Sequence, residues 1–180
     1  MKLIARNKAF FFDRDGVVNY RIVGNYVRTY EEMIIIPDFL PFFKLIKQKD
    51  YLAILVTNQQ GIGKGLMTLE DFHKVSIHMQ MYLKRTTGYV FDDIFFCPEL
   101  KSSNSPNRKP EPGMLLQAAS KWNIDMGNSW IVGDKDTDII AGKKAGVKSI
   151  LIGNLFNNHE LINPDYFFLN LQKALEELEL

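Results

Sequence analysis

The sequence predicts an α/β fold with a parallel sheet that carries helices on both of its faces. Short apolar runs recur along the chain, and each has the length and the residue types of a buried strand. Helical patterns separate these runs, and such alternation of strand and helix is typical of a parallel sheet. The five expected strands cover residues 9–12, 52–57, 94–96, 130–133 and 149–152.

The expected helices are marked by apolar spacing and by residues that begin or end helices. Thr68 and Asp71 form a capping box, in which each side chain bonds the backbone of the other residue. Gly146 is typical of a residue that ends a helix. We expect helices over 38–49, from Thr68, from Pro112, over 137–145, and from about Asn170 to the C-terminus.

Length and composition indicate one globular domain over residues 1–180. A chain of 180 residues can bury a substantial core, and its 46% hydrophobic and 24% charged residues are ordinary for a globular protein. The net charge of +1 argues against a nucleic-acid partner, which would call for a clearly basic balance. The sequence does not give the oligomeric state, and we favour a monomer.

Cysteine usage and hydropathy bear on the location of the protein. Cys97 is the only cysteine, so the chain has no intrachain disulfide and no cysteine-based metal cluster. No apolar stretch approaches the roughly 20 residues that a membrane-spanning helix needs. Residues 1–8 are too polar for a secretory signal. We therefore expect a cytoplasmic protein with no membrane partner.

Polar side chains follow four of the expected strands, at the edge where parallel sheets bind their ligands. Two carboxylates only two positions apart repel each other unless a cation or a proton relieves them. A fold that keeps such a pair is expected to use it, here as a carboxylate nucleophile with a neighbouring acid/base and a divalent metal. In strand order the clusters are Asp13 and Asp15; Thr57, Asn58 and Gln59; Arg108 and Lys109; and Gly133 with Asp134.

Each of these residues also has a purely structural interpretation. The Asp13–Asp15 pair could be an acidic turn that closes an exposed strand. Lys109 could be a solvated lysine, Asp134 a turn residue or helix cap, and Thr57 the end of a β-rich strand. We prefer the functional interpretation because one cleft would require all of these residue types together.

Taken together, the four clusters resemble the motifs of the haloacid dehalogenase (HAD) superfamily of phosphatases. Asp-Arg-Asp-Gly at 13–16 matches the first motif, Thr57 the second, Lys109 the third, and 133–138 the fourth. The resemblance covers about residues 8–153. It implies a Rossmann-like parallel sheet with no large cap domain.

The resemblance also implies a role for each residue. Asp13 would attack phosphorus and form an aspartyl-phosphate, and Asp15 would serve as general acid and then general base. The Thr57 hydroxyl and the Lys109 ammonium would bind the phosphoryl oxygens. Mg²⁺ would be held by the carboxylates of Asp13 and Asp134 and by the backbone carbonyl of Asp15.

Four further residues are expected to support this site. Arg108 would grip a second phosphate or sugar hydroxyls in bidentate fashion, with a surface ion pair as the alternative. Asn58 and Gln59 would donate hydrogen bonds to the nucleophile or the substrate, or simply cap the strand end. Asp138 would orient Lys109 or the metal shell, or favour the helix start.

Finer features resemble one branch, the D-glycero-D-manno-heptose 1,7-bisphosphate 7-phosphatases. This likeness implies a phosphorylated sugar as substrate and a place in nucleotide-activated heptose synthesis for lipopolysaccharide, capsule or S-layer. Two alternatives stay open: a histidinol-phosphate phosphatase, and a non-catalytic phosphate-binding protein that keeps the fold. The segments that carry the likeness are 13–19, 24–27, 56–65 and 108–115.

The chain departs from this branch in one feature. Relatives commonly carry a structural zinc loop with three cysteines and a histidine ahead of the third motif. Here Cys97 is the only thiol, and Asn107 stands where a cysteine would precede Arg108. One thiolate cannot form a tetrahedral zinc site. We therefore expect Mg²⁺ as the cofactor and no structural zinc.

Overall fold

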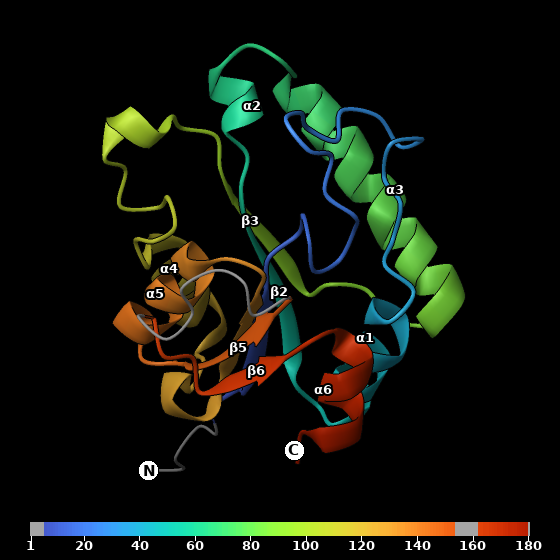
Figure 1. Cartoon of the computed structure of the whole chain (residues 1–180), viewed down its shortest axis with the longest axis vertical. Coiled ribbons are helices and arrows are strands. Elements are labelled where there is room, and N and C mark those ends of the chain that lie inside the picture. Colours follow the sequence, from blue (N-terminus) through green and yellow to red (C-terminus); the bar gives the residue numbers. More distant parts are fainter. Residues whose placement is uncertain (1–5, 154–161, 180) are drawn as a thin grey trace.

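Six parallel strands form one sheet in the part of the chain that this computed structural model describes, residues 6–153 and 162–179. The strands run in the order β3-β2-β1-β4-β5-β6 across the sheet (Figure 1). β1 therefore lies inside the sheet, between β2 and β4. Ligands of such a sheet bind beyond the carboxyl ends of the strands, where the strand order reverses. The strand bounds are β1 Ala9–Phe12, β2 Leu52–Asn58, β3 Asp93–Cys97, β4 Trp130–Gly133, β5 Lys148–Ile152 and β6 Tyr166–Phe168.

The five predicted strands are confirmed to within one residue at each end. β6 escapes the sequence prediction, because a run of three residues is too short to show a period. It pairs with β5 and forms one edge of the described sheet.

Most of the predicted helices begin and end at or near the expected residues, but α6 ends at Glu177 and does not reach the C-terminus as predicted, and the short α2 was not predicted. Asp71 N donates to Thr68 Oγ1 while Thr68 N donates to the Asp71 carboxylate, so the predicted capping box of α3 is confirmed. α5 ends at Gly146, whose φ of 80° lies in the left-handed region that glycine adopts without strain. Among the described residues, no helix is both long and apolar enough to cross a membrane. The bounds are α1 Phe39–Gln48, α2 Gln60–Gly63, α3 Leu69–Thr87, α4 Gly113–Trp122, α5 Asp136–Ala145 and α6 Leu171–Glu177.

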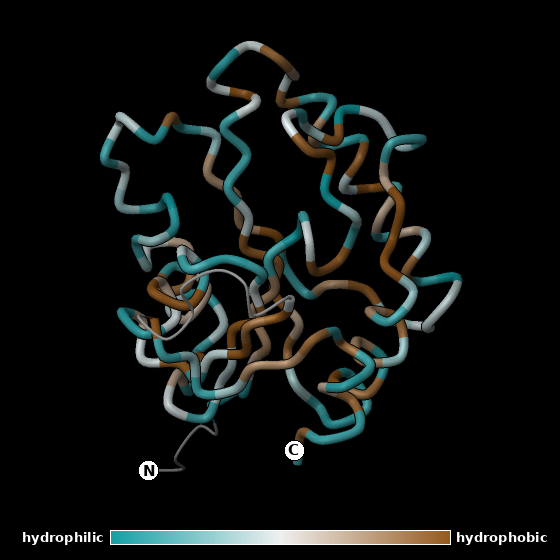
Figure 2. Tube along the Cα trace, viewed as in Figure 1, coloured by the Kyte–Doolittle hydropathy of each residue, from teal (hydrophilic) through white to brown (hydrophobic). Residues whose placement is uncertain are grey.

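Helices cover both faces of the sheet, as predicted. α1, α3 and α6 lie on one face, and α4 and α5 lie on the other (Figure 1). Because strand side chains alternate between faces, Phe10 and Phe12 join the core beneath α1 while Ala9 and Phe11 join the core beneath α4 and α5. Figure 2 shows hydrophobic residues gathered along the central strands. β1 is therefore held from both sides, close to the two aspartates that follow it.

Candidate active site

The polar residues predicted to share one cleft do meet at the carboxyl edge of the sheet. Asp13 directly follows β1, and its backbone N–H donates to Val132 O of β4 at 3.0 Å. Lys109 comes from the loop before α4, and its Nζ lies 2.9 Å from Asp13 Oδ1. The same Nζ lies 2.6 Å from Asp138 Oδ1 on α5. Three segments far apart in the sequence thus join in one buried ion-pair network.

Lys109 is a buried cation and not the solvated lysine of the structural interpretation. Its ammonium donates to Asp13, to Asp138, and at 2.7 Å to the carbonyl of Val56. Burial disfavours the charge, but the carboxylates of Asp13 and Asp138 outweigh it and raise the pKa of Lys109 above its ordinary value. The two carboxylates therefore favour the charged form of this lysine.

Three carboxylates form the acidic part of the site. Oxygen atoms of Asp13, Asp134 and Asp138 all lie within 4.8 Å of one another. Burial, reinforced by the charge of Asp13, raises the pKa of Asp134 to about 7. Burial likewise raises the pKa of Asp138. Such a cluster is costly without a cation, and its hard oxygen donors suit Mg²⁺.

Two glycines allow these carboxylates to come so close to the backbone. A Cβ on Gly16 would lie 2.1 Å from Asp134 Oδ2, and Gly16 also has a φ of 105°. A Cβ on Gly133 would lie 2.2 Å from Asp138 Cβ. Any larger residue at either position would push an aspartate out of the cluster.

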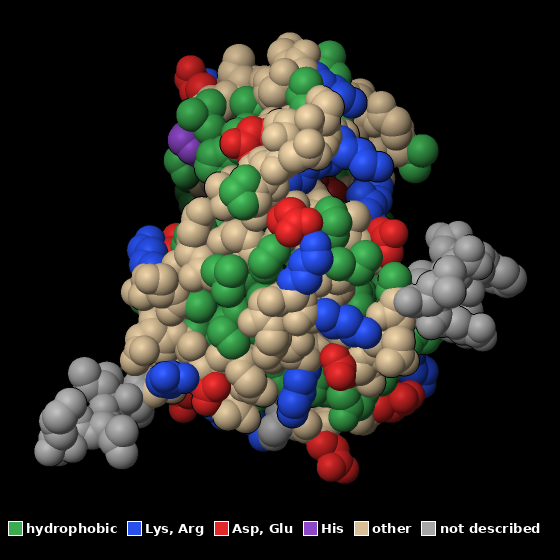
Figure 3. Space-filling view, turned by 90° about the vertical axis from the view of Figure 1, so that its left-hand side faces the viewer, with side chains coloured by type: hydrophobic (Ala, Val, Ile, Leu, Met, Phe, Trp, Pro, Cys, Tyr) green, Lys and Arg blue, Asp and Glu red, His purple; other side chains and the backbone are tan. Residues whose placement is uncertain are grey.

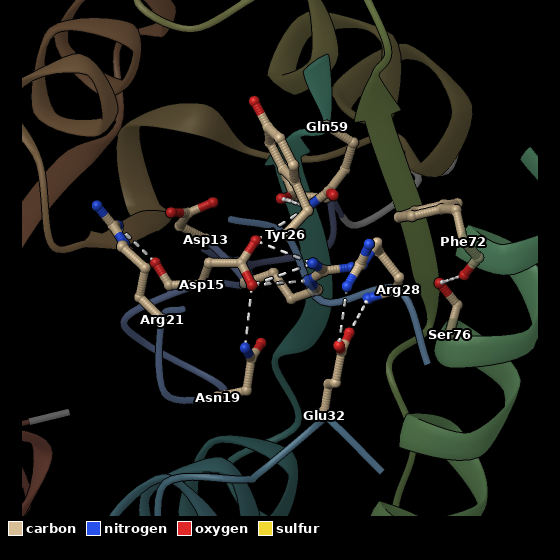
Figure 4. Close-up of polar contacts among 12 residues, drawn as sticks. Asp13, Asp15, Asn19, Arg21, Tyr26, Arg28, Glu32, Gln59, Phe72 and Ser76 are labelled. Atoms are coloured by element: carbon tan, nitrogen blue, oxygen red, sulfur yellow. Dashed lines mark hydrogen bonds and ion pairs between the residues drawn. The ribbon is translucent and has the colours of Figure 1, made fainter. Parts of the chain in front are cut away.

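Asp15 turns its carboxylate away from this cluster. It accepts hydrogen bonds from Arg14 Nη2 at 3.0 Å on both oxygens, from Asn19 Nδ2 at 2.9 Å, and from Gln59 Nε2 at 3.1 Å (Figure 4). Burial opposes the charge of Asp15, but Arg14 and the two amides outweigh it and lower its pKa. Arg14 is fully buried, with its guanidinium over the Phe72 ring. The sequence interpretation gave neither Arg14 nor Asn19 a role, although Arg14 stands between the two aspartates.

Asn58 and Gln59 contact other site residues in this structure. Gln59 is fully buried, and its Nε2 donates to Thr57 Oγ1 at 2.9 Å as well as to Asp15. Asn58 Nδ2 donates to Lys109 O at 2.9 Å, and Asn58 Oδ1 accepts from Lys109 N at 3.0 Å. We therefore interpret both amides as positioning residues, although Asn58 also reaches the wall of the pocket described next.

A pocket of about 790 Å³ opens above the ion-pair network. Tyr26 forms part of its wall and packs closely on Gly61 of α2, where a Cβ would come within 2.8 Å of the ring. Arg108 also lines the pocket, and its guanidinium donates to Glu99 O at 3.1 Å and more distantly to Gln60 Oε1. Figure 3 shows Lys and Arg side chains gathered around a hollow below the top of the molecule. The basic residues of the pocket wall are Arg21, Lys64, Lys101, Arg108, Lys109 and Lys135.

Hydrogen bonds hold the loop that carries Arg108 and Lys109. Arg108 N donates to Ser105 O at 3.1 Å, and Asn107 N donates to Ser105 Oγ at 3.2 Å. The buried Cys97 donates from Sγ to Glu99 Oε2 at 3.2 Å, and burial raises the pKa of this thiol. These bonds explain how the loop keeps its shape, while the expected lack of structural zinc stays a prediction.

Comparison with known proteins gives consistent relatives. The HAD-hydrolase-like family model matches residues 106–174. The D-glycero-beta-D-manno-heptose-1,7-bisphosphate 7-phosphatase of Helicobacter pylori (strain J99) is 37% identical over 83% of this chain and 85% of its own length. The D-glycero-alpha-D-manno-heptose-1,7-bisphosphate 7-phosphatase of Burkholderia mallei is 38% identical over 82% of this chain and 80% of its own.

A solved structure resembles the whole molecule. The D,D-heptose 1.7-bisphosphate phosphatase from B. bronchiseptica, complexed with magnesium and phosphate, superposes with a TM-score of 0.85 at 30% sequence identity. The match covers 95% of this chain and 97% of the other.

Proposed function

Because the chain belongs to the HAD-like phosphatases, in the branch of the heptose-1,7-bisphosphate 7-phosphatases, we propose that it removes the 7-phosphate of a D-glycero-D-manno-heptose 1,7-bisphosphate. One structural observation carries the chemistry: the Lys109 ammonium lies 2.9 Å from Asp13 Oδ1, and Lys109 also lines a basic pocket. The proposal includes Mg²⁺ as the cation, the cytoplasm as the location, and nucleotide-activated heptose synthesis as the pathway.

The proposed reaction has two steps. A carboxylate oxygen of Asp13 attacks phosphorus, the bond between phosphorus and the sugar oxygen breaks, and Asp15 gives that oxygen a proton. A water molecule then attacks phosphorus, Asp15 takes a proton from it, and cleavage of the aspartyl-phosphate frees phosphate and restores Asp13. The Arg14 and amide contacts keep Asp15 ionised before substrate binds. A nearby phosphate dianion raises the pKa of the acid by like-charge repulsion, so Asp15 is expected to take up its proton on binding.

Lys109, Thr57 and the cation would balance the charge of the transferred group. The Lys109 ammonium and the Thr57 hydroxyl would donate to the equatorial oxygens of phosphorus. The carboxylates of Asp13 and Asp134 and the backbone carbonyl of Asp15 would hold Mg²⁺, which when bound neutralises part of the phosphoryl charge. Asp138 would hold Lys109 in position through its 2.6 Å contact.

The pocket wall supports a substrate with a second anionic group. Lys64, Lys101 and Arg108 line the pocket in addition to the phosphoryl-binding Lys109. A bisphosphate could meet this excess positive charge at both of its ends, whereas histidinol phosphate carries one phosphate and a cationic amine. This charge balance favours the heptose bisphosphate over the histidinol-phosphate alternative.

A substrate panel tests the proposal. Phosphate release is measured for α- and β-heptose 1,7-bisphosphate, histidinol phosphate and simple sugar phosphates, each with and without Mg²⁺. We expect Mg²⁺-dependent release with the highest kcat/KM for a heptose bisphosphate, and at least a 10³-fold loss in Asp13→Asn, the scale of losing a nucleophile. Asp125→Asn is the matched control, because Asp125 precedes β4 at the opposite edge of the sheet and should keep full activity.

Two results would overturn the proposal. A preference for histidinol phosphate would refute the substrate and leave the chemistry intact. Negligible release from every compound, equal in wild type and Asp13→Asn, would favour a non-catalytic phosphate-binding protein.

A further inference from the structure

Arg21 lies on groups that are expected to hold the metal. Its Nη2 is 2.7 and 2.6 Å from the two carboxylate oxygens of Asp134, and 2.6 Å from the backbone oxygen of Asp15. Figure 4 shows Arg21 reaching the Asp15 backbone, while the Asp15 carboxylate points to the other side, toward Asn19. Two of the three proposed metal ligands therefore already bind a cation supplied by the chain.

Arg21 and Mg²⁺ compete for these oxygens. Arg21 Nη2 lies where the two Asp134 oxygens and the Asp15 backbone oxygen converge, and a Mg²⁺ held by the same groups at about 2.0–2.1 Å would repel the guanidinium charge from that point. The charge of Arg21 also offsets part of the repulsion within the acidic cluster. Burial and the charge of Asp13 raise the pKa of Asp134, and the charge of Arg21 lowers it. The guanidinium of Arg21 thus neutralises part of the carboxylate charge that a divalent ion would neutralise when bound.

The contacts of Arg21 leave its side chain incompletely satisfied. Its Nε is buried and has no hydrogen-bond partner in the described part of the structure. An unpaired buried donor is costly, so this arrangement can give way to a better one. The side chain is 31% exposed, and it lines the 790 Å³ pocket together with Lys109. The pocket therefore gives the guanidinium space to move away from Asp134, and a phosphate bound at Lys109 would attract its positive charge.

We propose that Arg21 is a built-in counter-cation, which occupies the metal site in the metal-free enzyme and is displaced into the pocket by Mg²⁺, where it binds an anionic group of the substrate. This inference rests on the proposed phosphatase function and adds an order of events to it. Metal binding frees a phosphate-binding side chain, so Mg²⁺ promotes substrate binding through Arg21 as well as directly. The cost is a lower affinity for the metal, because the arginine must first leave.

The first test measures Mg²⁺ binding alone, by isothermal titration calorimetry without substrate. If Arg21 occupies the site in about 90% of molecules, the observed affinity is reduced about tenfold, and Arg21→Gln should recover that factor. Arg28→Gln is the matched control in the same loop, because the exposed Arg28 pairs with the partly buried Glu32 and should leave Mg²⁺ affinity unchanged. An unchanged or weaker affinity in Arg21→Gln would overturn the proposal.

The second test follows substrate binding at saturating Mg²⁺. Arg21→Gln should raise KM for the substrate about tenfold, the worth of one charged hydrogen bond, and leave kcat within about twofold. An unchanged KM would refute the part of the proposal that gives Arg21 a substrate contact. If Arg21→Gln does not fold, Arg21→Met replaces it: this variant keeps a long side chain, loses the charge that lies on Asp134, and should likewise bind Mg²⁺ more tightly than wild type.

The two proposals can fail separately. The calorimetric result does not depend on which phosphate ester the enzyme prefers. A preference for histidinol phosphate would therefore refute the substrate assignment while the Mg²⁺ affinity of Arg21→Gln still decides the role of Arg21.

Discussion

Replacing Gly16 by alanine would place a methyl group against the Asp134 carboxylate. The new Cβ would lie 2.1 Å from Asp134 Oδ2 and 2.5 Å from Asp134 Cγ. Carbon makes its normal contacts at about 3.5 Å, so the carboxylate must retreat by at least about 1 Å. The φ of 105° at this position adds strain for any residue with a side chain, of order 1–3 kcal/mol.

This displacement should damage both stability and metal binding. The backbone strain predicts that Gly16→Ala lowers the free energy of unfolding by about 1–3 kcal/mol. A shift of about 1 Å in a group that orients the reaction can cost about 10²-fold in rate, so kcat/KM should fall by that factor. Mg²⁺ affinity should fall as well, because Asp134 is a proposed ligand.

Urea denaturation, calorimetric Mg²⁺ titration and phosphate release measure the three effects. Gly88→Ala is the control: Gly88 has a φ of 85° at the end of α3, but a Cβ there would have no heavy atom within 4 Å. It should lose about 1–2 kcal/mol of stability and keep full activity and metal affinity. If Gly16→Ala behaves like Gly88→Ala in all three assays, the Asp134 carboxylate can move without loss of function. The prediction that a Cβ at position 16 disrupts the site is then refuted.

Two further predictions concern charged contacts. Asp138→Asn removes the charge that faces Lys109 at 2.6 Å and should lower kcat by about 10- to 100-fold with an unchanged circular dichroism spectrum, whereas a wild-type kcat would contradict the positioning role. Asp93 accepts hydrogen bonds from Trp122 Nε1 at 2.8 Å and from Lys121 Nζ at 2.7 Å; burial opposes its charge, but these contacts lower its pKa below the ordinary 3.8. The free energy of unfolding that this lowered pKa contributes is present above the ordinary pKa and is lost as pH falls through the lower folded pKa. The free energy of unfolding of Asp93→Asn should therefore fall less than that of wild type between about pH 5 and pH 2. If urea denaturation gives the same loss of stability with falling pH for wild type and Asp93→Asn, the contribution of Asp93 is refuted.

The fold could be predicted because its signals are local. Each predicted strand is an apolar run, and the capping box at Thr68 and the glycine at 146 mark helix ends within a few residues. Ligands bind beyond the carboxyl ends of parallel strands, and this rule predicts that Asp13, Lys109 and Asp134 lie close together. β6 lacked such a signal, because it is three residues long and gains its order from pairing with β5.

The contacts that long loops make with distant segments could not be predicted from the sequence. Arg21 lies 113 positions from Asp134 in a segment without clear periodicity, so nothing nearby in the chain indicates their ion pair. Gln59 was assigned to nucleophile or substrate from its position at a strand end, but whether its amide turns outward or inward depends on tertiary packing. The structure turns it inward, to Asp15 and Thr57.

The place of β1 inside the sheet has a consequence for the dynamics of the site. A strand that is paired on both sides loses its hydrogen bonds only when a neighbouring strand also separates, and such inner strands belong to the last units to open in native-state hydrogen exchange. The amide of Asp13, bonded to Val132 O, extends this ladder by one residue. The loop that carries Arg21 and Tyr26 has no strand pairing of comparable extent among the described residues. Asp13, the proposed nucleophile, is therefore expected to exchange its amide hydrogen more slowly than the residues of the loop that carries Arg21 and Tyr26.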